Sequence, residues 1–242
     1  RIRHSFIMEN VGEMWQADTC YYFKIPMKNG MGWVYVQGIL DDTSRYITAA
    51  RCYTEDNAAN FRKTLKYAIE HHHIPSLVVV DNGAPYVDKD LLSLCNRLGI
   101  ALVNTRANDG AGKGAIERWW QTLEGATMLD LAIENPETVE EVQAIVDKWV
   151  NKYHHRVNRG IGDTPLNKYT DSIARHPVRK PASKAWLDEQ FYLTVTRSVR
   201  CTAVQINAVK YRVPDELAWE KNVTVRYDPE DIAGTIHIYH NK

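Results

Sequence analysis

The segment "LVVVDNGAPY", residues 77–86, joins a run of apolar residues to an acid and a turn. The run 77–80 has the character of a buried strand, Asp81 follows directly, and Asn82-Gly83 is a turn pair. The aspartate is either an ordinary turn residue or a ligand held at the tip of a rigid strand, where chemistry is often placed. Asp81 alone does not distinguish these interpretations, whereas a second and a third acid beside it would.

The bulk composition is that of a globular protein. The chain has 242 residues, of which 44% are hydrophobic and 25% are charged, enough for one core or for a larger and a smaller domain. No stretch approaches the ~20 apolar residues of a membrane span, and no signal peptide is visible. Because the sequence begins with Arg1, we expect a fragment of a longer protein. The four cysteines have no metal-ligand spacing, so we expect reduced thiols in a cytoplasmic protein.

The formal net charge is zero, with 30 basic and 30 acidic residues. DNA-binding proteins usually have a basic excess, so overall charge argues against an extended nucleic-acid surface. The middle segment, 136–200, has 11 basic and 8 acidic residues. Any basic surface is therefore expected to be local and to lie in this segment.

Strands and helices alternate around the opening segment. The pattern predicts strands over 14–23, 31–42, 45–53, 77–80 and 100–104, and helices over 57–71, 88–98, 116–133 and 137–154. The first three strands follow one another and favour an antiparallel meander. The glycine-rich stretch 105–115 is expected to be a mobile surface loop. This order indicates an α/β domain with a mixed sheet flanked by helices.

The C-terminal part changes to a period of two residues. A segment with prolines and basic residues, 172–190, is predicted to be a linker. Short alternating strands follow at 192–200, 202–213, 222–228 and 235–240, with turns such as Asn207-Ala208. This pattern predicts a small all-β barrel. We therefore expect a core domain over 1–135, a helical extension and basic linker over 136–190, and the barrel over 191–242.

Two further acids lie at positions from which they could join Asp81. Asp18 lies inside the first strand in "WQADTC", where an acid is unfavourable unless it is paired or used. Glu117 lies in the first turn of the helix after the glycine-rich stretch, where the helix dipole alone favours an acid. Each acid by itself has an ordinary structural explanation. The combination is more specific, because 35 residues separate Asp81 from Glu117.

This arrangement resembles the D,D-35-E triad of the retroviral integrase and transposase superfamily. The surrounding segments "WQADTC", "DDTSRYI", "VVVDNGAPY" and "GKGAIERWWQTL" are similar to those around the acids of that family, and the resemblance extends to "NKYHHRVNRGIGDTPLNKY" at 151–169. The C-terminal segment beginning "KYRVPDELAW" resembles the small barrel of phage Mu-type transposases. The zinc-binding N-terminal module of retroviral integrases is absent from this sequence, as are the DNA-end-binding domains expected upstream in Mu-type proteins.

The resemblance implies a ribonuclease H-like fold and metal-dependent DNA chemistry. Carboxylate oxygens select Mg²⁺ or Mn²⁺, and two such ions can clamp a phosphodiester for in-line displacement. In this family Asp18 would contact both ions, and Asp81 and Glu117 one each. The implied reaction is 3′-end cleavage of transposon DNA and strand transfer into target DNA by an oligomer. The resemblance also suggests an ATPase partner for target selection and a bacterial, nucleoid-associated location.

Several other residues are candidates for DNA contact. Three lie around the catalytic glutamate and four in the basic middle segment: Lys113, Arg118 and Arg106, then Arg156, Arg159, Arg179 and Lys180. The triplet 71–73 is histidine, but three adjacent residues at a helix end do not all face one ion, so we expect no metal there. Trp119 and Trp120 are expected to be core residues.

Two other functions share part of this pattern. A ribonuclease H-like nuclease has the same fold and metals, but takes an acid from its first helix, where this sequence offers only Glu70 at the far end. A non-catalytic subunit that binds DNA or assembles a complex would not need the complete triad.

Overall fold

The computed structural model describes residues 8–105 and 113–240. The chain divides into two compact units, one ending at Pro181 and one beginning at Ala182. Each unit is described by itself. Among the described residues, no helix combines the length and apolar character needed to cross a membrane.

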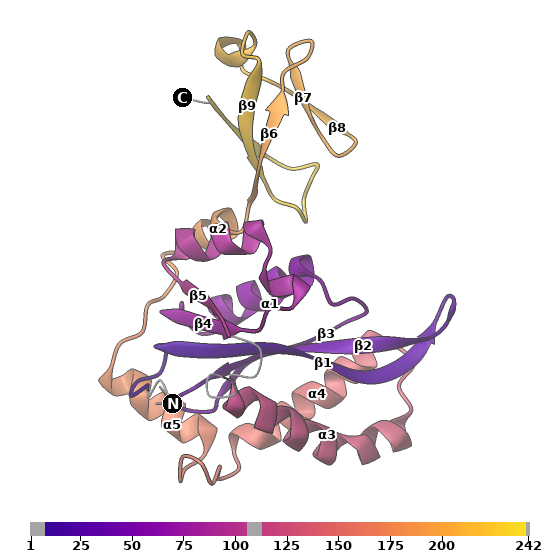
Figure 1. The fold of residues 1–242 in the computed structure, drawn as a ribbon, viewed down its shortest axis with the longest axis vertical. Helices are drawn as coiled ribbons and strands as arrows, with labels where there is room; N and C mark the ends of the chain where they lie inside the picture. The colour runs from indigo at the N-terminus through magenta and orange to yellow at the C-terminus, as the bar shows by residue number, and fades with distance from the viewer. Residues whose placement is uncertain (1–7, 106–112, 241–242) are drawn as a thin grey trace. The chain divides into compact units, whose positions relative to one another are not determined.

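The first unit is built on a five-stranded mixed sheet. Its strands are β1 (Met14–Met27), β2 (Gly30–Asp41), β3 (Ile47–Tyr53), β4 (Leu77–Val80) and β5 (Ala101–Asn104). They lie in the order β3-β2-β1-β4-β5, in which β1 pairs antiparallel with β2 and parallel with β4. This confirms the predicted meander and mixed sheet. The distal part of the β1–β2 hairpin extends beyond the other strands (Figure 1).

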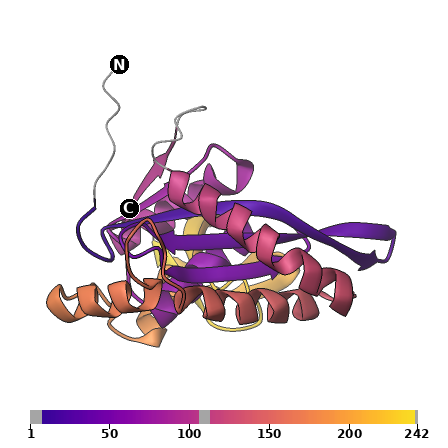
Figure 2. The same ribbon diagram turned by 90° about the horizontal axis from the view of Figure 1, so that it is seen from below.

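Helices cover both faces of this sheet. They are α1 (Ala58–His71), α2 (Lys89–Leu98), α3 (Gly114–Glu134), α4 (Val139–His154) and α5 (Pro165–Arg175), with a short 3-10 turn η1 (Ala84–Tyr86). Helices α1 and α2 lie on one side of the sheet, and α3 and α4 lie on the other (Figure 1). Figure 2 shows α3 and α4 running side by side. The predicted fold class, a mixed sheet flanked by helices, is confirmed.

Helix α4 belongs to this core, so the predicted domain boundary at residue 135 is wrong. Its buried face, which includes Val142 and Val146, packs with α3 and the sheet in one apolar cluster. Gln143 also bonds the edge strand β3, accepting from the Cys52 N–H at 2.8 Å and donating to the Ala50 carbonyl at 2.9 Å. An unpaired strand edge is a risk that proteins commonly cover in this way.

A cluster of rings joins α1, α4 and α5 to the turn between β2 and β3. Tyr46 stacks on His154 and on Tyr169, with centroid distances of 3.8 and 4.3 Å. His73 is fully buried, and its Nδ1 lies 2.9 Å from the Tyr169 hydroxyl. His154 accepts a hydrogen bond from the Ile47 N–H. His73 and His154 are thus packing residues of this ring cluster.

The free energy of unfolding is expected to fall as the pH drops from about 7 to about 4. Burial lowers the pKa of His72 and of His73 to about 4, and that of His154 to about 3. The unfolded chain binds protons on these rings near the ordinary histidine pKa of about 6.5, so acid favours unfolding. Asp41 opposes this trend, because burial raises its pKa to about 6. One carboxyl against three imidazoles leaves a net loss of stability.

Denaturant unfolding at a series of pH values measures this effect. His154→Gln keeps an acceptor for the Ile47 N–H but removes one titrating ring, so its stability should depend less steeply on pH. His71→Gln, at an exposed histidine, is the comparison and should change the slope less than His154→Gln does. Equal slopes in all three proteins would contradict the assignment.

The predicted linker is only partly irregular. Helix α5 extends to Arg175, and a further helix, α6 (Lys184–Gln190), is capped by the Ser183 hydroxyl, which accepts from the Trp186 N–H. Between them, Arg179 fixes the chain to the first unit. Its guanidinium donates to the carbonyls of Pro75, Leu98 and Gly99. The segment 172–190 is therefore two helices and a clamped connection.

The second unit contains α6 and five strands around a small apolar core. Its strands are β6 (Leu193–Ser198), β7 (Ala203–Ile206), β8 (Val209–Arg212), β9 (Asn222–Tyr227) and β10 (Ile236–His240), with a 3-10 turn η2 (Asp215–Leu217). The order β10-β9-β6 forms one antiparallel sheet, and β7-β8 forms a hairpin whose turn residue Asn207 has φ 50°. The all-β character of the strands is as predicted, and the two sheets enclose one apolar cluster.

Candidate active site

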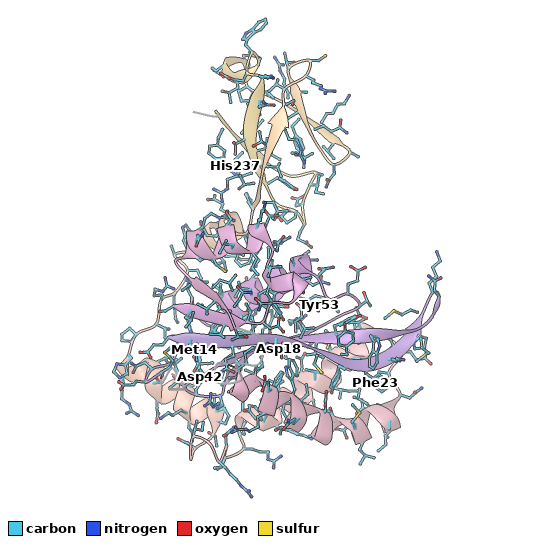
Figure 3. All side chains as sticks on the ribbon, viewed as in Figure 1. Met14, Asp18, Phe23, Asp42, Tyr53 and His237 are labelled. Carbon is cyan, nitrogen blue, oxygen red and sulfur yellow. The ribbon has the colours of Figure 1, made fainter. Side chains whose placement is uncertain are left out.

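Strand pairing explains how Asp18 and Asp81 come together. Strands β1 and β4 run parallel, with Gln16 opposite Val79. Continuing this register by two residues brings Asp18 level with Asp81. Figure 3 shows Asp18 midway along the central strand of the sheet. The acid in the middle of one strand and the acid at the end of its neighbour are therefore direct neighbours.

The turn after β4 fixes Asp81. Its Oδ1 accepts from the Gly83 N–H at 2.7 Å, and its carbonyl accepts from the Asn104 amide at 2.8 Å. A Cβ on Gly83 would lie 2.8 Å from Asp81 Oδ1, so this position favours glycine. The predicted turn Asn82-Gly83 thus orients the carboxylate and leaves Oδ2 directed at the site.

Lys113 places a cation between the two carboxylates. Its Nζ lies 2.8 Å from Asp18 Oδ1 and 3.4 Å from Asp81 Oδ2. The lysine side chain is 7% exposed, against 17% for Asp18 and 45% for Asp81. A buried ammonium needs such partners, because an unpaired charge away from water is costly.

A glutamine on β1 holds the start of α3 against the sheet. Gln16 is buried, and its Oε1 accepts from the Ile116 N–H at 3.0 Å. The first N–H groups of a helix have no partner within the helix, so this bond both caps α3 and docks it. The Gln16 amide also donates to Asp42 at 2.7 Å. Helix α3 therefore begins beside Asp18, with Glu117 in its first turn.

A tryptophan also fixes Asp18. Trp120 is buried, as expected for a core residue, but its Nε1–H donates to Asp18 Oδ2 at 3.1 Å. The strand opposite leaves room for the indole at Gly38, the register partner of Asp18. A Cβ on Gly38 would lie 2.6 Å from Trp119 Cζ3 and 2.8 Å from Trp120 Cη2. The absence of a side chain at residue 38 therefore lets α3 approach the acid.

Gly38→Ala is expected to lower the free energy of unfolding by about 1–3 kcal/mol, the usual cost of overpacking a core. The new methyl group pushes the two indoles away from the sheet, so catalytic activity should fall as well. Gly125→Ala is the matched control. Gly125 lies on the exposed side of α3 with open space around it, so alanine should stabilise by up to about 1 kcal/mol. Chemical denaturation of both variants tests the contrast, and an unaffected Gly38→Ala protein would contradict it.

A hydrogen-bonded brace supports the site from the other face of β1. The Thr19 hydroxyl donates to Asp56 Oδ1 at 3.1 Å and lies 2.8 Å from the Tyr86 hydroxyl. Since a carboxylate only accepts, the Thr19 proton goes to Asp56 and Tyr86 donates to Thr19. Tyr86 is buried in the turn after Asp81. The brace therefore connects Thr19, the residue after Asp18, to the turn that carries Asp81.

Cys20 is the cysteine nearest in sequence to Asp18, and it is not a nucleophile. Burial raises the pKa of its thiol far above the ordinary value, and the hydrogen bond it donates to Glu124 raises it further. The protonated thiol is a poor nucleophile. The site thus has acids and a lysine for its chemistry.

The donor set suits a hard divalent cation. Asp18 and Asp81 direct oxygen atoms at one positively charged atom, the Lys113 nitrogen, and carboxylate oxygen is the ligand that Mg²⁺ prefers. Glu117 is exposed one helical turn from Lys113, whose carbonyl accepts from the Glu117 N–H. Over residues 8–105 and 113–240, no three acids, histidines or cysteines converge on one point at metal-binding distance. The structure thus brings two of the three predicted acids together.

A basic groove lies between α3, α4 and the loop after α4. It has a volume of about 680 Å³. Five cations line it, from Arg118 at the start of α3 to the loop after α4: Arg118, Lys148, Lys152, Arg156 and Arg159. Asp130 is the one acid among the described residues that line the groove, and Lys148 pairs with Glu134 at 3.8 Å. The side chains of the other four lining cations make no hydrogen bond or ion pair with another residue in the described part of the chain.

The structure separates the predicted DNA contacts into groups. Arg118, Arg156 and Arg159 line the groove, and Lys113 lies in the acid cluster. The Arg179 guanidinium donates to three backbone carbonyls, and its contact with DNA stays a prediction. Lys180 is exposed outside the groove, and Arg106 falls outside the described residues.

Other functional residues were missed by sequence reasoning. Lys148 and Lys152 could have been found from the sequence, because they share one face of α4. Arg156, just after the helix, continues the same spacing of four residues. Gln16 and Gly38 act through contacts with distant segments, which no local pattern reveals.

Comparisons with known protein families agree with this architecture. Residues 9–109 match the Integrase core domain, a range that includes Asp18 and Asp81 and ends before Glu117. Residues 188–242 match the domain described as Mu transposase, C-terminal. The transposase for transposon Tn552 of Staphylococcus aureus is 24% identical over 243 residues, covering 91% of this chain. The chain spans about half the length of that relative, 50%.

Solved structures share the fold at low sequence identity. A chain of the simian T-cell lymphotropic virus intasome, in complex with PP2A regulatory subunit B56 gamma, superposes with a TM-score of 0.60 at 15% identity, covering 90% of this chain and 80% of its own. The catalytic core domain of BIV integrase gives 0.53 at 21% identity, with coverages of 68% and 97%. The HTLV-2 integrase catalytic core domain in complex with magnesium gives 0.52 at 14%, with coverages of 65% and 96%.

Proposed function

We propose that the chain is a DNA transposase or retroviral-type integrase, since residues 9–109 match the Integrase core domain and residues 188–242 match the Mu transposase C-terminal domain. Its first unit would perform metal-dependent cleavage at the 3′ ends of transposon DNA and join those ends to target DNA. The observation that carries the proposal is the pair Asp18 and Asp81, held by neighbouring parallel strands around one cationic atom. The similarity to the family indicates the class of reaction. The geometry of Asp18 and Asp81 indicates where in the chain the reaction would take place.

We infer that the site works with two Mg²⁺ ions, for which Mn²⁺ can substitute. Asp18 would contact both ions, and Asp81 and Glu117 one each. Bound metal would activate the attacking oxygen and stabilise the leaving oxygen of the phosphodiester. Trp120 and Gly83 hold the two aspartates in orientation through their N–H groups, which reduces the cost of bringing like charges together. Glu117 is exposed in the first turn of α3, so its side chain would have to turn toward the two aspartates to join them.

The basic groove is the surface we assign to the DNA backbone. It begins at Arg118, the residue after Glu117, and follows α3 and α4 to Arg159. Cations aimed at phosphates supply most sequence-independent affinity for DNA. The groove is local, which agrees with a net charge of zero for the whole chain. It contacts backbone rather than bases, so it positions DNA without reading sequence.

We also propose that the chain acts as an oligomer on DNA. Joining two element ends to one target needs two sets of catalytic acids at a fixed spacing, and one chain supplies one set. Linked copies on one DNA raise the effective concentration, which compensates for weak single contacts. The expected ATPase partner remains a prediction.

Strand transfer with pre-cleaved DNA ends tests the proposed function. Labelled duplexes copied from the ends of the element that encodes the chain are incubated with supercoiled plasmid and the full chain. Joined products should form with Mg²⁺ or Mn²⁺ and poorly with Ca²⁺, which is larger and looser in geometry. Excess chelator should stop the reaction. Undiminished joining in chelator would refute the two-metal proposal.

A further inference from the structure

Lys113 occupies an unusual place for a residue that precedes a catalytic helix. It is the N-cap residue of α3, and its own side chain does not cap the helix. The side chain is instead buried and extends to the acids, where Nζ contacts Asp18 Oδ1 and Asp81 Oδ2. The start of α3 is fixed by Gln16, so the lysine backbone is held while the long side chain can move.

The ammonium contacts the same oxygen atoms that a divalent ion would bind. Two aspartates and one lysine carry a summed formal charge of −1, against −2 for the aspartates alone. The lysine therefore reduces the repulsion between the two carboxylates when no other cation is present. A metal ion and an ammonium cannot both occupy the space between these oxygens, because they repel each other as well as overlap. Metal binding at this point therefore requires Lys113 to leave.

We propose that Lys113 is an internal counter-ion which competes with the metal for Asp18 and Asp81 and which DNA draws away. This inference rests on the proposed function. Outside the acid pair the lysine needs another anion, and a DNA phosphate at the same site supplies one. Whatever stabilises the displaced lysine also favours metal binding, and the reverse holds by linkage. The metal and DNA therefore bind cooperatively, and the site loads its metal fully when the substrate is present.

Mn²⁺ titration of the full chain tests this directly, by calorimetry or by electron paramagnetic resonance. Without DNA, Lys113→Met should bind Mn²⁺ about tenfold more tightly than wild type, which corresponds to about 1.4 kcal/mol. A short duplex should tighten Mn²⁺ binding in wild type and have a much smaller effect in the variant. Equal or weaker Mn²⁺ binding by Lys113→Met, or equal stimulation by DNA in both proteins, would overturn the inference.

Two further variants keep the result interpretable. In chelator, Lys113→Met should unfold at a lower temperature than wild type, because its two aspartates lose their counter-ion, and Mn²⁺ should restore stability. If Lys113→Met fails to fold, Lys113→Gln replaces it as the neutral variant and must show the same tighter binding. Asp18→Asn separates the two ideas. If it binds Mn²⁺ as well as wild type, the proposed metal site fails, whereas a dependence on Asp18 without one on Lys113 refutes the counter-ion alone.

Discussion

Asp18→Asn, Asp81→Asn and Glu117→Gln are each expected to reduce strand transfer by at least about 10³-fold. Each substitution replaces a proposed metal ligand, a carboxylate, by a neutral amide of the same size. Metal ions at such sites supply several kcal/mol of transition-state stabilisation, and each 1.36 kcal/mol lost is a factor of ten in rate. The one amide oxygen that Asp18→Asn introduces can accept from the Trp120 indole or from Lys113 Nζ. Asp81 still contacts the lysine, so we expect a folded protein of lower stability.

The matched control is Glu124→Gln, the same chemical change two turns further along α3. Glu124 accepts from the Cys20 thiol, an interaction that glutamine can replace, so we expect activity within about twofold of wild type. Strand transfer is measured in Mg²⁺ and in Mn²⁺, with circular dichroism to establish that each variant is folded. A folded variant of any of the three acids with near-normal activity would remove that residue from the site.

The architecture of the first unit could be predicted because its signals are local. Apolar runs and turn residues define the strands, and the 35-residue spacing identifies the acids. The convergence of Asp18 and Asp81 follows from the parallel pairing of β1 with β4. The structure does not complete the triad, since Glu117 is exposed and not in the acid cluster. The direction of the Glu117 carboxylate depends on the rotamer of its side chain, and the 35-residue spacing does not determine that rotamer.

The interactions that hold the acids could not be predicted from local patterns. Lys113 and Trp120 meet Asp18 across about a hundred positions of sequence, and the gap at Gly38 has meaning only when the indoles lie opposite. Trp120 is buried, as expected, but burial is only part of its role. A tryptophan has an apolar ring and also an N–H that donates a hydrogen bond. Sequence reasoning assigned it to one role when the fold uses both.

The structure between residues 164 and 190 differs from the predicted linker for a definable reason. Prolines and basic residues suggested a linker over 172–190, but two short helices extend into that range. One is capped by Thr164 and the other by Ser183. The bonds of Arg179 to the first unit could not be predicted, because nothing in the local sequence distinguishes an arginine that binds backbone carbonyls from one that does not. Its three carbonyl partners come from segments about 80 to 100 residues away.

Neutralising the groove is the second change with a large expected effect. The triple variant Lys152→Gln, Arg156→Gln, Arg159→Gln should bind duplex DNA roughly 10²-fold more weakly at physiological salt, at about 1 kcal/mol for each exposed cation. If each cation neutralises one phosphate, the slope of log K against log salt concentration should fall by about 3. These side chains are exposed and lack partners in the described part of the chain, so the fold should tolerate the change.

Net charge is the competing explanation, and a second triple variant separates it from the groove. Lys28→Gln, Lys63→Gln, Lys89→Gln removes the same charge at exposed positions outside the groove lining. Fluorescence anisotropy with a labelled duplex, measured from about 50 to 200 mM salt, compares both variants with wild type. If DNA follows α3 and α4, the groove variant alone loses affinity and salt dependence. Parallel losses in the two variants would instead mean that binding follows overall charge, and the groove would lose its assignment as the path of the DNA backbone.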